Sequence, residues 1–487
     1  MRHMKFSYRR PDWRSYQHHL KKKNARKNRM RKTGFYSLFF TFLAFAVYGI
    51  SGKNLDSAVS DPGTRAASSP APFQKNPPRT PQEKRKTVRA VSRLPAENSQ
   101  IISKSEIISL VDSDIFLNIK EKRFSYHFDG HRFLLDTSID SHLQNFVLDH
   151  LDRENARYIG VVVMDPDTGR VLSMAGYDSS DSGKNTCTDA LFPAASIFKI
   201  VTAAAAVEEC GFRSDSTLFL RGGRYTLYRS QLKKEAQGRP VSLRDSFAQS
   251  INPVFGKLGI HFLGKKHLES QALAFGFNRP IRFEIPVERS VIRLSDDPFH
   301  LAEIASGFNR STAISPLHGA LIVSSIAANQ GRLPEPAIID RLSDEKGRVL
   351  YRSRPRYLQQ AVNPETSGII KNMMQETIRS GTCRKIFRNH EKHPVLSRLH
   401  MGGKTGSIGS RNHENRRYDW FVGFAEEKEG GRKIAVSIVV THEKYIGIKA
   451  GQYARMIMEE YFRTAFSGNA AEKPQTGDRT ENRKTHT

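Results

Sequence analysis

The stretch FPAASIFKI, which runs from Phe192 to Ile200, decides how this chain folds and what chemistry it can perform. It continues without a break into VTAAAAVEECG, which ends at Gly211. The alanine run favours a helix, and glycine is common just past a helix end. Because proline is tolerated in a first helical turn but not deeper, we predict a helix that begins near Pro193 and stops at Gly211.

Ser196 and Lys199 lie three positions apart in this predicted helix, so we expect them to share one face. A serine hydroxyl is a weak nucleophile and needs a nearby base. A lysine can be that base when apolar surroundings lower its pKa. Ile197, Phe198 and Ile200 supply such surroundings. The pattern predicts a serine that forms an acyl-enzyme with a lysine as its partner.

The same Ser-x-x-Lys spacing occurs twice more, which shows how little the spacing establishes alone. Ser230 and Lys233 lie in a polar, charged stretch. Ser343 and Lys346 lie in a segment typical of a turn. Neither pair precedes an apolar helix, so a chance spacing on a solvated surface explains both of them.

A second polar pair, Ser250 and Asn252, lies further along the chain. The segment that holds it, from Arg244 to Pro253, reads as a helix that ends in Asn-Pro, and this dipeptide marks a helix boundary. Ser250 and Asn252 are two residues apart, so in a non-helical loop both polar side chains can point into one cavity. The Ser-x-Asn pattern carries little weight alone, because it recurs twice elsewhere in the chain.

A third pattern, MGGKTGS, follows a basic loop and ends at Ser407. Its glycines, Gly406 among them, allow the backbone to approach a neighbouring group closely. Lys404, Thr405 and Ser407 offer an ammonium and two hydroxyls to an anionic ligand. The Lys-Thr-Gly triplet is also a weak signal alone, since it recurs near the N-terminus.

Apolar runs, two of them rich in β-branched residues, predict buried strands on both sides of these patterns. The four runs are 158–164, 170–177, 420–424 and 434–440. The turn DPDTG at 165–169 should join the first two as a hairpin, and Asp129-Gly130 predicts another hairpin among alternating residues. Besides the helix at Ser196, apolar patterns predict helices at about 136–154, 314–328, 369–378 and 453–466.

Much of the formal net charge of +28 lies in the first 33 residues, where Asp12 is the only acidic residue. A nucleic-acid arm is one interpretation of such a run. Residues 34–50 carry no charge and would span roughly 25 Å as a helix, slightly short of a ~30 Å hydrocarbon core. Basic residues before this segment and weaker charge after it favour an uncleaved membrane anchor with a cytoplasmic N-terminus. A cleaved signal peptide is the alternative, but its basic region is normally short.

We therefore divide the chain into six parts. These are a basic cytoplasmic tail (1–33), a transmembrane helix (34–50), a Pro/Ser-rich linker (51–100), a small lead-in segment (101–133), a main domain (134–466) and a disordered tail (467–487). The three cysteines, Cys187, Cys210 and Cys383, allow at most one internal bridge, which excludes a disulfide scaffold. The spacing of cysteines and histidines matches no zinc site.

Each of the three patterns is weak alone, but their order along the chain is a stronger signal: a helix-borne Ser-x-x-Lys, then Ser-x-Asn, then Lys-Thr-Gly before paired strands. In this order the sequence resembles the penicillin-binding transpeptidase family, the serine acyltransferases that cross-link peptidoglycan. The resemblance covers roughly Leu134 to Phe466. It extends to the hairpin at 162–174 and to the stretches 275–277, 314–317, 380–382 and 419–423.

The resemblance implies an α/β (α+β) fold in which an antiparallel sheet packs beside an all-helical subdomain, with the active site in the cleft between them. Carried over position by position, Ser196 would be the nucleophile and Lys199 its base. Ser250 would relay a proton, Asn252 would hold the substrate's amide, and Lys404 would add positive potential.

The remaining site residues implied by the resemblance belong to substrate binding. Thr405, Gly406 and Ser407 would line the substrate, with the two hydroxyls on its carboxylate, and the N–H groups of Ser196 and Ser407 would form the oxyanion hole. The implied substrate is a stem peptide ending in D-Ala-D-Ala, which β-lactams would mimic. The resemblance implies no metal and no cofactor.

The sequence also departs from the family pattern. Only about 80 residues separate the predicted anchor from the main domain, which argues against a glycosyltransferase domain there, and the entry motif of the pedestal found in division enzymes is absent.

We expect a monofunctional D,D-transpeptidase, anchored in the inner membrane by one helix, with its catalytic domain periplasmic or otherwise extracytoplasmic. Expected partners are stem peptides, β-lactams and other cell-wall synthesis proteins, but not nucleic acid. A D,D-carboxypeptidase, a class D-like β-lactamase and a β-lactam sensor without turnover remain alternatives.

Overall fold

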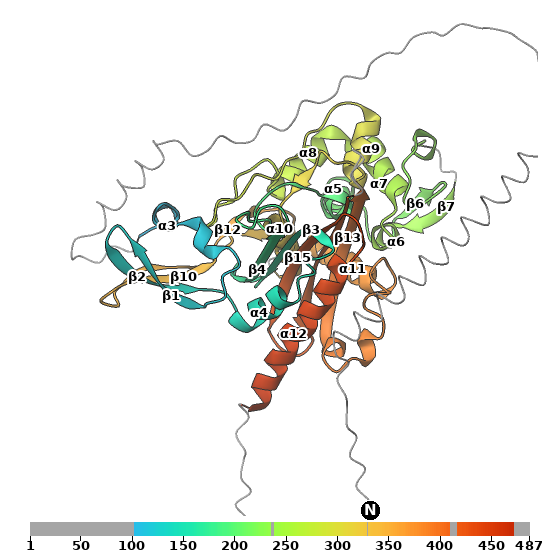
Figure 1. The fold of residues 1–487 in the computed structure, drawn as a ribbon. Helices are drawn as coiled ribbons and strands as arrows, with labels where there is room; N and C mark the ends of the chain where they lie inside the picture. Colours follow the sequence, from blue (N-terminus) through green and yellow to red (C-terminus); the bar gives the residue numbers. More distant parts are fainter. Residues whose placement is uncertain (1–101, 235–237, 329, 410–415, 472–487) are drawn as a thin grey trace, which may run out of the picture. The chain divides into compact units, whose positions relative to one another are not determined.

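The computed structural model describes residues 102–234, 238–328, 330–409 and 416–471 of the 487-residue chain. The predicted cytoplasmic tail, transmembrane helix and linker lie outside these residues. Within the described ranges, no helix combines the length and the apolar character needed to cross a bilayer. Figure 1 shows a central sheet with helices packed on it, a mainly helical region to one side and a smaller sheet to the other.

Five antiparallel strands form the central sheet in the order β13-β14-β15-β3-β4. Their bounds are β3 Ala156–Met164, β4 Val171–Asp178, β13 Leu399–Gly409, β14 Arg417–Glu427 and β15 Lys433–His442. All four predicted strand runs are confirmed, and the turn at 165–169 joins β3 to β4 as a hairpin. β13 is an edge strand, so half of its backbone N–H and C=O groups point away from β14.

Helices cover both faces of this sheet, and their bounds are α4 Ser141–Asp149, α10 Pro316–Ala327, α11 Pro364–Arg379 and α12 Ala450–Ala471. Phe421 and Val422 are consecutive on β14, so their side chains point to opposite faces. Val422 lies against Gly319 of α10, whereas Phe421 lies against Gly451 of α12. α10 and α12 therefore sandwich the sheet, while α4 packs on β4 and α11 packs on β13 (Figure 1).

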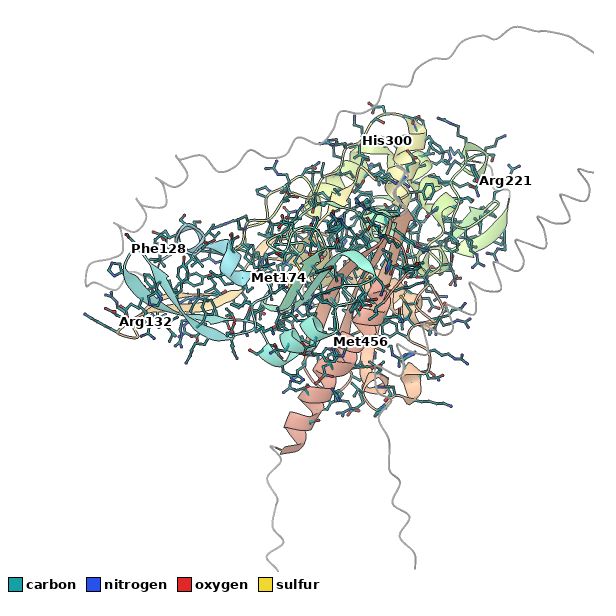
Figure 2. The ribbon with its side chains drawn as sticks, in the orientation of Figure 1. Phe128, Arg132, Met174, Arg221, His300 and Met456 are labelled. Carbon is teal, nitrogen blue, oxygen red and sulfur yellow. The ribbon has the colours of Figure 1, made fainter. Side chains whose placement is uncertain are left out.

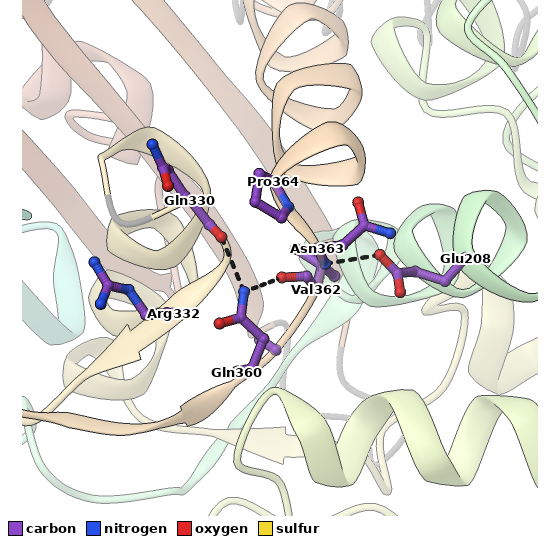
Figure 3. Close-up of a pocket in the computed structure, with 8 residues that line it drawn as sticks. Glu208, Gln330, Arg332, Gln360, Val362, Asn363 and Pro364 are labelled. Carbon is purple, nitrogen blue, oxygen red and sulfur yellow. Dashed lines mark hydrogen bonds between the residues drawn. The ribbon is translucent and has the colours of Figure 1, made fainter.

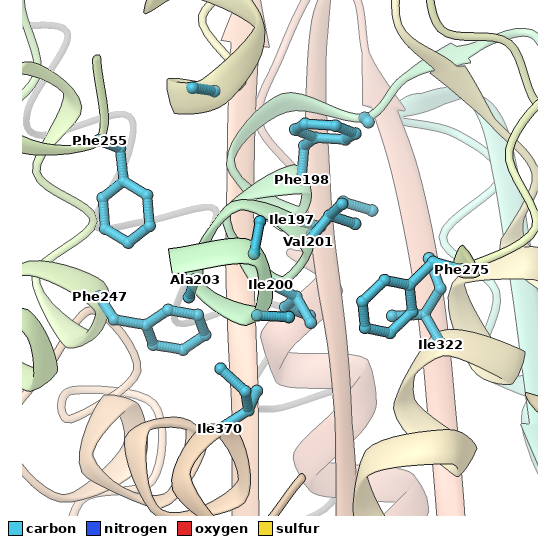
Figure 4. Packing of buried hydrophobic residues seen from close by; sticks show 14 of the residues in the cluster. Ile197, Phe198, Ile200, Val201, Ala203, Phe247, Phe255, Phe275, Ile322 and Ile370 are labelled. Carbon is cyan, nitrogen blue, oxygen red and sulfur yellow. The ribbon is translucent and has the colours of Figure 1, made fainter. Parts of the chain in front are cut away.

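The helical region surrounds one central helix, α5. Its elements are η2 Ala195–Phe198, α5 Lys199–Cys210, α6 Leu243–Ala248, α7 Asn252–Leu258, η4 Gly259–Leu263, α8 Gly264–Ala274 and α9 Pro298–Ser306. α5 is buried on all sides from Lys199 to Val207, as expected of a helix that is apolar all round. Figure 4 shows Ile200 of α5 in the core that Phe247 of α6 and Phe255 of α7 share with it.

A second, four-stranded sheet joins the first described residues to a much later segment, in the order β1-β2-β10-β11. Its strands are β1 Arg123–Phe128, β2 His131–Thr137, β10 Ile339–Asp344 and β11 Val349–Arg352. The predicted hairpin at Asp129-Gly130 is confirmed, and both residues have the positive φ that such a turn requires.

The predicted lead-in segment (101–133), for which a place within the main domain (134–466) is the other interpretation, is described from residue 102 onward. β2 runs across the boundary between these two ranges and pairs with β10. Helix α3 (Lys104–Leu110) and the turn η1 (Ser113–Phe116) bury Ile107 and Phe116 in the same core as Leu342 of β10. Burial of these apolar side chains makes the segment part of the domain.

Short elements complete the fold. Three two-stranded ribbons pair β5 Phe192–Pro193 with β8 Ala313–Ile314, β6 Thr217–Leu220 with β7 Arg239–Ser242, and β9 Arg332–Pro334 with β12 Tyr357–Gln360. Three single turns are η3 Arg229–Gln231, η5 His390–Lys392 and η6 Leu396–Arg398.

Several helix ends differ from the predicted ones for identifiable reasons. No helix begins near residue 136, because Thr137 ends β2 and the Asp140 side chain caps α4 instead. The Asn-Pro dipeptide begins α7 rather than following a helix end, since proline is well tolerated in a first turn. α12 continues to Ala471, beyond the predicted end at Phe466.

Candidate active site

Ser196 lies in the turn η2, which leads directly into α5. The chain enters this turn in a backbone conformation that residues other than glycine rarely adopt, because Ala195 has a φ of 48°. Gly307, which ends α9, lies against the Ala195 carbonyl so closely that a Cβ there would overlap it. Trp420 Nε1 donates to the Pro193 carbonyl at 2.9 Å. Contacts from α9 and β14 therefore hold the strained turn that carries Ser196.

Lys199 is the first residue of α5, and its side chain is completely buried. Its Nζ donates to Ser196 Oγ at 2.9 Å, to Asn252 Oδ1 at 2.8 Å and to the carbonyl oxygen of Ser306. Burial lowers the pKa of Lys199 well below its ordinary value, and the charge of Lys404 lowers it further. A neutral amine in contact with a serine hydroxyl can accept its proton.

The loop between α6 and α7 brings Ser250 and Asn252 to the same place. Both side chains are almost fully buried, and Ser250 has a positive φ of 56°. Asn252 accepts from Lys199 through Oδ1, donates through Nδ2 to the Tyr225 carbonyl at 3.1 Å, and donates its backbone N–H to the Arg224 carbonyl at 2.8 Å. The second N–H of its amide and one lone pair of Oδ1 are left for a ligand.

Lys404 reaches this group from strand β13. Its Nζ donates to Ser250 Oγ and to the Thr405 carbonyl, both at 2.9 Å, and lies 5.6 Å from the centre of the Phe247 ring. Burial lowers the pKa of Lys404 to about 7, while the Cys383 thiol acts in the opposite direction. The three sequence patterns thus meet at two buried lysines.

Gly406 lets β13 lie directly against the Ser196 turn. A Cβ at this position would lie 3.2 Å from Ala195 Cβ and 3.3 Å from the Ser196 nitrogen, so a side chain would push the strand and the turn apart. Because β13 is an edge strand, its free backbone groups can pair with an extended ligand beside Ser196.

The hydroxyls after Lys404 have partners that sequence reasoning did not assign to the site. Thr405 Oγ1 lies 2.6 Å from Thr382 Oγ1, in the turn after α11. Ser407 is exposed, and its Oγ donates to Asp419 Oδ1 at 3.1 Å, while Asp419 Oδ2 accepts from the Ala450 backbone N–H at 2.9 Å. The sequence contains both partners in stretches that resemble the family, but no local pattern links either of them to the Lys-Thr-Gly segment.

The other Ser-x-x-Lys pairs do not form comparable sites. Ser230 and Lys233 are both exposed, and Ser343 is buried in β10 while Lys346 is exposed in the following turn. Cys187, Cys210 and Cys383 are free thiols. Among the described residues, no three histidine, cysteine or acidic side chains are grouped so that they could hold a metal ion.

A cavity of about 490 Å³ lies far from Ser196, at the C-terminal end of α5 (Figure 3). There Glu208 Oε1 accepts from the Asn363 backbone N–H at 2.9 Å, and Gln360 Nε2 donates to the Gln330 carbonyl at 2.9 Å. None of the predicted site residues lines this cavity.

The sequence matches known proteins over the region that holds this site. Residues 159–459 match the family described as penicillin binding protein transpeptidase domain. Stage V sporulation protein D of Bacillus subtilis is 26% identical over 325 residues, which are 62% of this chain and 49% of that protein. Peptidoglycan D,D-transpeptidase PbpA of Mycolicibacterium smegmatis is 24% identical over 318 residues, or 58% of this chain and 61% of that one. The chain therefore spans only about half to three fifths of the length of these relatives.

Solved structures show the same fold. The D,D-transpeptidase domain of a peptidoglycan glycosyltransferase from Eggerthella lenta has a TM-score of 0.55 and 26% identity, and the match covers 69% of this chain and 84% of that one. PBPA from Mycobacterium tuberculosis has the same TM-score with 22% identity, and the match covers 68% of this chain and 81% of that one. At this identity the likeness concerns the fold alone. With more than half of its length matched by the family and the fold in agreement, the chain belongs to the penicillin-binding protein transpeptidase domain family.

Proposed function

We propose that this protein is a peptidoglycan D,D-transpeptidase that works through an acyl-enzyme on Ser196. The observation that carries the proposal is the completely buried Lys199, whose Nζ lies 2.9 Å from Ser196 Oγ and whose pKa is lowered by burial and by Lys404. The contact supplies a neutral base to a hydroxyl that would otherwise be a poor nucleophile.

In the acylation step, Lys199 Nζ takes the proton of Ser196 Oγ as the oxygen attacks the carbonyl carbon of the penultimate D-alanine. The backbone N–H groups of Ser196 and Ser407 stabilise the oxyanion, and each such donor contributes about 3 kcal/mol to transition-state stabilisation. The C–N bond then breaks, and the leaving D-alanine amine takes the proton that Lys199 accepted, relayed through Ser250, whose hydroxyl Lys404 holds by a hydrogen bond. An amine of a neighbouring stem peptide then attacks the ester carbonyl and gives a proton to Lys199. Lys199 returns this proton to Ser196 Oγ as the ester C–O bond breaks, which leaves the cross-link and the restored enzyme.

Substrate binding in this proposal follows the contacts of β13. The peptide lies along the free edge of β13 at Gly406, and Asn252 holds its amide with the N–H that remains available. Its terminal carboxylate lies at Lys404 and Thr405. Ser407 donates its hydroxyl to Asp419, so it contributes chiefly its backbone N–H.

We propose that residues 34–50 form a single membrane anchor with the N-terminus in the cytoplasm, that residues 51–100 serve as a spacer, and that the catalytic domain lies outside the cytoplasm. The uncharged run after a basic block supports this topology. Other cell-wall synthesis proteins are the partners that such an anchored enzyme would meet.

The test is a two-substrate assay on the full chain. A donor peptide ending in D-Ala-D-Ala and an acceptor peptide with a free amine are incubated with the protein, and the products are separated by mass. We expect a cross-linked product and free D-alanine, both absent with Ser196→Ala. Release of D-alanine without a cross-link would instead identify a carboxypeptidase, and rapid hydrolysis of a chromogenic cephalosporin would identify a β-lactamase.

A further inference from the structure

The segment from Arg221 to Lys234, here called the basic loop, follows β6 and leads towards β7. It lies beside Asn252. Its formal charge comes from five cations and no carboxylate: Arg221, Arg224, Arg229, Lys233 and Lys234. All five are exposed. Figure 2 shows Arg221 at the outer side of the helical region, away from Phe128 and Arg132 of the second sheet.

The basic loop has a defined shape because one buried glutamine organises it. Gln231 Nε2 donates to the carbonyls of Arg221 at 2.9 Å and Gly223 at 3.1 Å, and its Oε1 accepts from the Tyr228 N–H at 2.9 Å and from Thr226 Oγ1 at 3.1 Å. All four contacts lie within the loop, so its backbone conformation does not depend on a ligand.

The loop is also fastened to the candidate active site. The backbone N–H of Asn252 donates to the Arg224 carbonyl, and Asn252 Nδ2 donates to the Tyr225 carbonyl. Leu227 and Leu232 of the loop pack with Ala302 of α9 in a small apolar cluster. A ligand whose amide is held by Asn252 therefore passes next to this loop.

The charges of the basic loop are not neutralised within the described residues. No acidic side chain described in the structure forms an ion pair with any of its five cations, although Arg213 and Lys265 elsewhere on the helical region do have such partners. Burial lowers the pKa of Lys257, and the charge of Arg221 lowers it further. Tyr225 and Tyr228 leave 60% and 62% of their surface exposed. Arg224 donates to Gln249 Oε1 at 3.1 Å and Arg229 lies over the Phe299 ring, but neither contact neutralises a charge. Cations without a carboxylate partner among the described residues, interleaved with exposed aromatic rings, suit a ligand with carboxylates and an extended backbone.

We propose that the basic loop binds the part of the donor stem peptide that precedes the D-alanyl residues, and that it selects peptides with free carboxylates there. The proposal rests on the proposed function, because it takes Asn252 as the residue that holds the donor's amide. The cations pair with those carboxylates, and the tyrosines cover the peptide backbone. The loop thus determines specificity at a distance from Ser196, where the bond is broken.

The experiment measures binding without turnover. The protein is the full chain carrying Ser196→Ala, kept in detergent. It is titrated into a fluorescent pentapeptide that ends in D-Ala-D-Ala and bears free carboxylates on its first three residues. A second titration uses the same peptide with those carboxylates amidated. Fluorescence anisotropy gives both dissociation constants. We expect the acidic peptide to bind about tenfold more tightly, with the preference reduced at high salt because the charges involved are exposed.

The matched variants locate the preference. Arg221→Gln combined with Lys233→Gln and Lys234→Gln removes three loop cations, and we expect it to abolish most of the preference. Lys346→Gln with Arg352→Gln and Arg354→Gln removes three exposed cations from the second sheet, and we expect it to retain the preference.

Three outcomes would overturn the proposal. The first two are equal binding of the two peptides and a loop variant that keeps the full preference. The third comes from a competition experiment, in which a single-stranded oligothymidine displaces the acidic peptide at a lower concentration than the unlabelled peptide does. Labelling of the Ser196-containing protein by a fluorescent penicillin is scored separately. If penicillin does not label Ser196 but the protein still prefers the acidic peptide, the result would count against the proposed function but not against the proposed role of the basic loop.

Discussion

Lys404 Nζ donates to Ser250 Oγ across 2.9 Å, and this contact joins the edge strand of the sheet to the helical region. Lys404 is also the charge that lowers the pKa of Lys199 beyond the effect of burial. Two buried ammonium groups destabilise each other, so one of the two is favoured in its neutral form. The base of the proposed reaction is therefore maintained by a residue more than 200 positions away in the sequence.

Lys404→Met should move the pH profile of acylation as well as slow the reaction. With the charge of Lys404 removed, the pKa of Lys199 rises, so a smaller fraction of Lys199 is neutral at a given pH. The ascending limb of kcat/KM for a penicillin should shift to higher pH. Lys257→Met, which removes another buried cation of the helical region, should leave that limb in place. An unchanged limb in Lys404→Met would contradict the coupling between the two lysines.

The Thr382 hydroxyl, 2.6 Å from that of Thr405, should matter for anionic ligands in particular. If Thr382 donates to Thr405, the Thr405 proton is free to bind the substrate carboxylate, and the chain of hydrogen bonds is polarised by the negative charge. Thr382→Val should reduce the ratio of acylation rates for a penicillin and its methyl ester by about tenfold, since a hydrogen bond to a charged group contributes about 1.5–3 kcal/mol. Thr382→Ser, which keeps the hydroxyl, should preserve the ratio; an equal loss in both variants would speak for a packing role alone.

Two glycines with nearly the same φ provide a matched pair for the strained turn at Ser196. Gly307 and Gly211 end α9 and α5 with φ values of 67° and 66°. The Cβ added by Gly211→Ala meets no atom within 4 Å. This variant should lower the free energy of unfolding by only about 1–2 kcal/mol, the cost of the left-handed conformation. Gly307→Ala places its Cβ against the Ala195 carbonyl, so it should destabilise the protein more and also slow penicillin labelling of Ser196. Denaturant unfolding and labelling rates check both effects, and equal behaviour of the two variants would refute the steric argument.

Asp419→Asn should separate the two contacts of this carboxylate. The amide oxygen can still accept one hydrogen bond, but the N–H of Ala450 or the hydroxyl of Ser407 loses an acceptor and α12 loses a negative charge at its first turn. We expect a loss of about 1 kcal/mol in unfolding free energy, together with faster acylation by a carboxylate-bearing penicillin. Asp297→Asn at the start of α9 should lower stability similarly without the gain in rate. Slower acylation in Asp419→Asn would contradict the account of Ser407.

Local chemistry made most of the elements predictable. The apolar runs became β3, β4, β14 and β15; β3 and β15 are rich in β-branched side chains, which pack well on a buried sheet. The Ser196–Lys199 contact was predictable from a spacing of three residues in a helical segment, even though η2 is a tighter turn than an α-helix. Asp129-Gly130 formed its hairpin because both residues tolerate positive φ.

The parts that could not be predicted depend on contacts between distant segments. The pairing of β2 with β10 decides that residues 102–133 belong to the domain, and nothing in either strand alone indicates its partner. The neighbours Thr382 and Asp419 come from other strands and turns, so no local pattern connects them to Thr405 and Ser407. The lack of ion pairs between the basic loop and the other described residues is likewise visible only when its surroundings are known.

The central claim is that Ser196 is the residue made nucleophilic by Lys199. The most direct measurement is a mass spectrum of the penicillin-treated full chain after trypsin digestion. The account predicts one penicilloyl adduct, on the peptide 185–199 and mapped to Ser196. With Lys199→Met, where trypsin yields the longer peptide 185–213, it predicts that this longer peptide carries no adduct under the same conditions. An adduct on any other residue, or undiminished labelling of Ser196 in Lys199→Met, would contradict it.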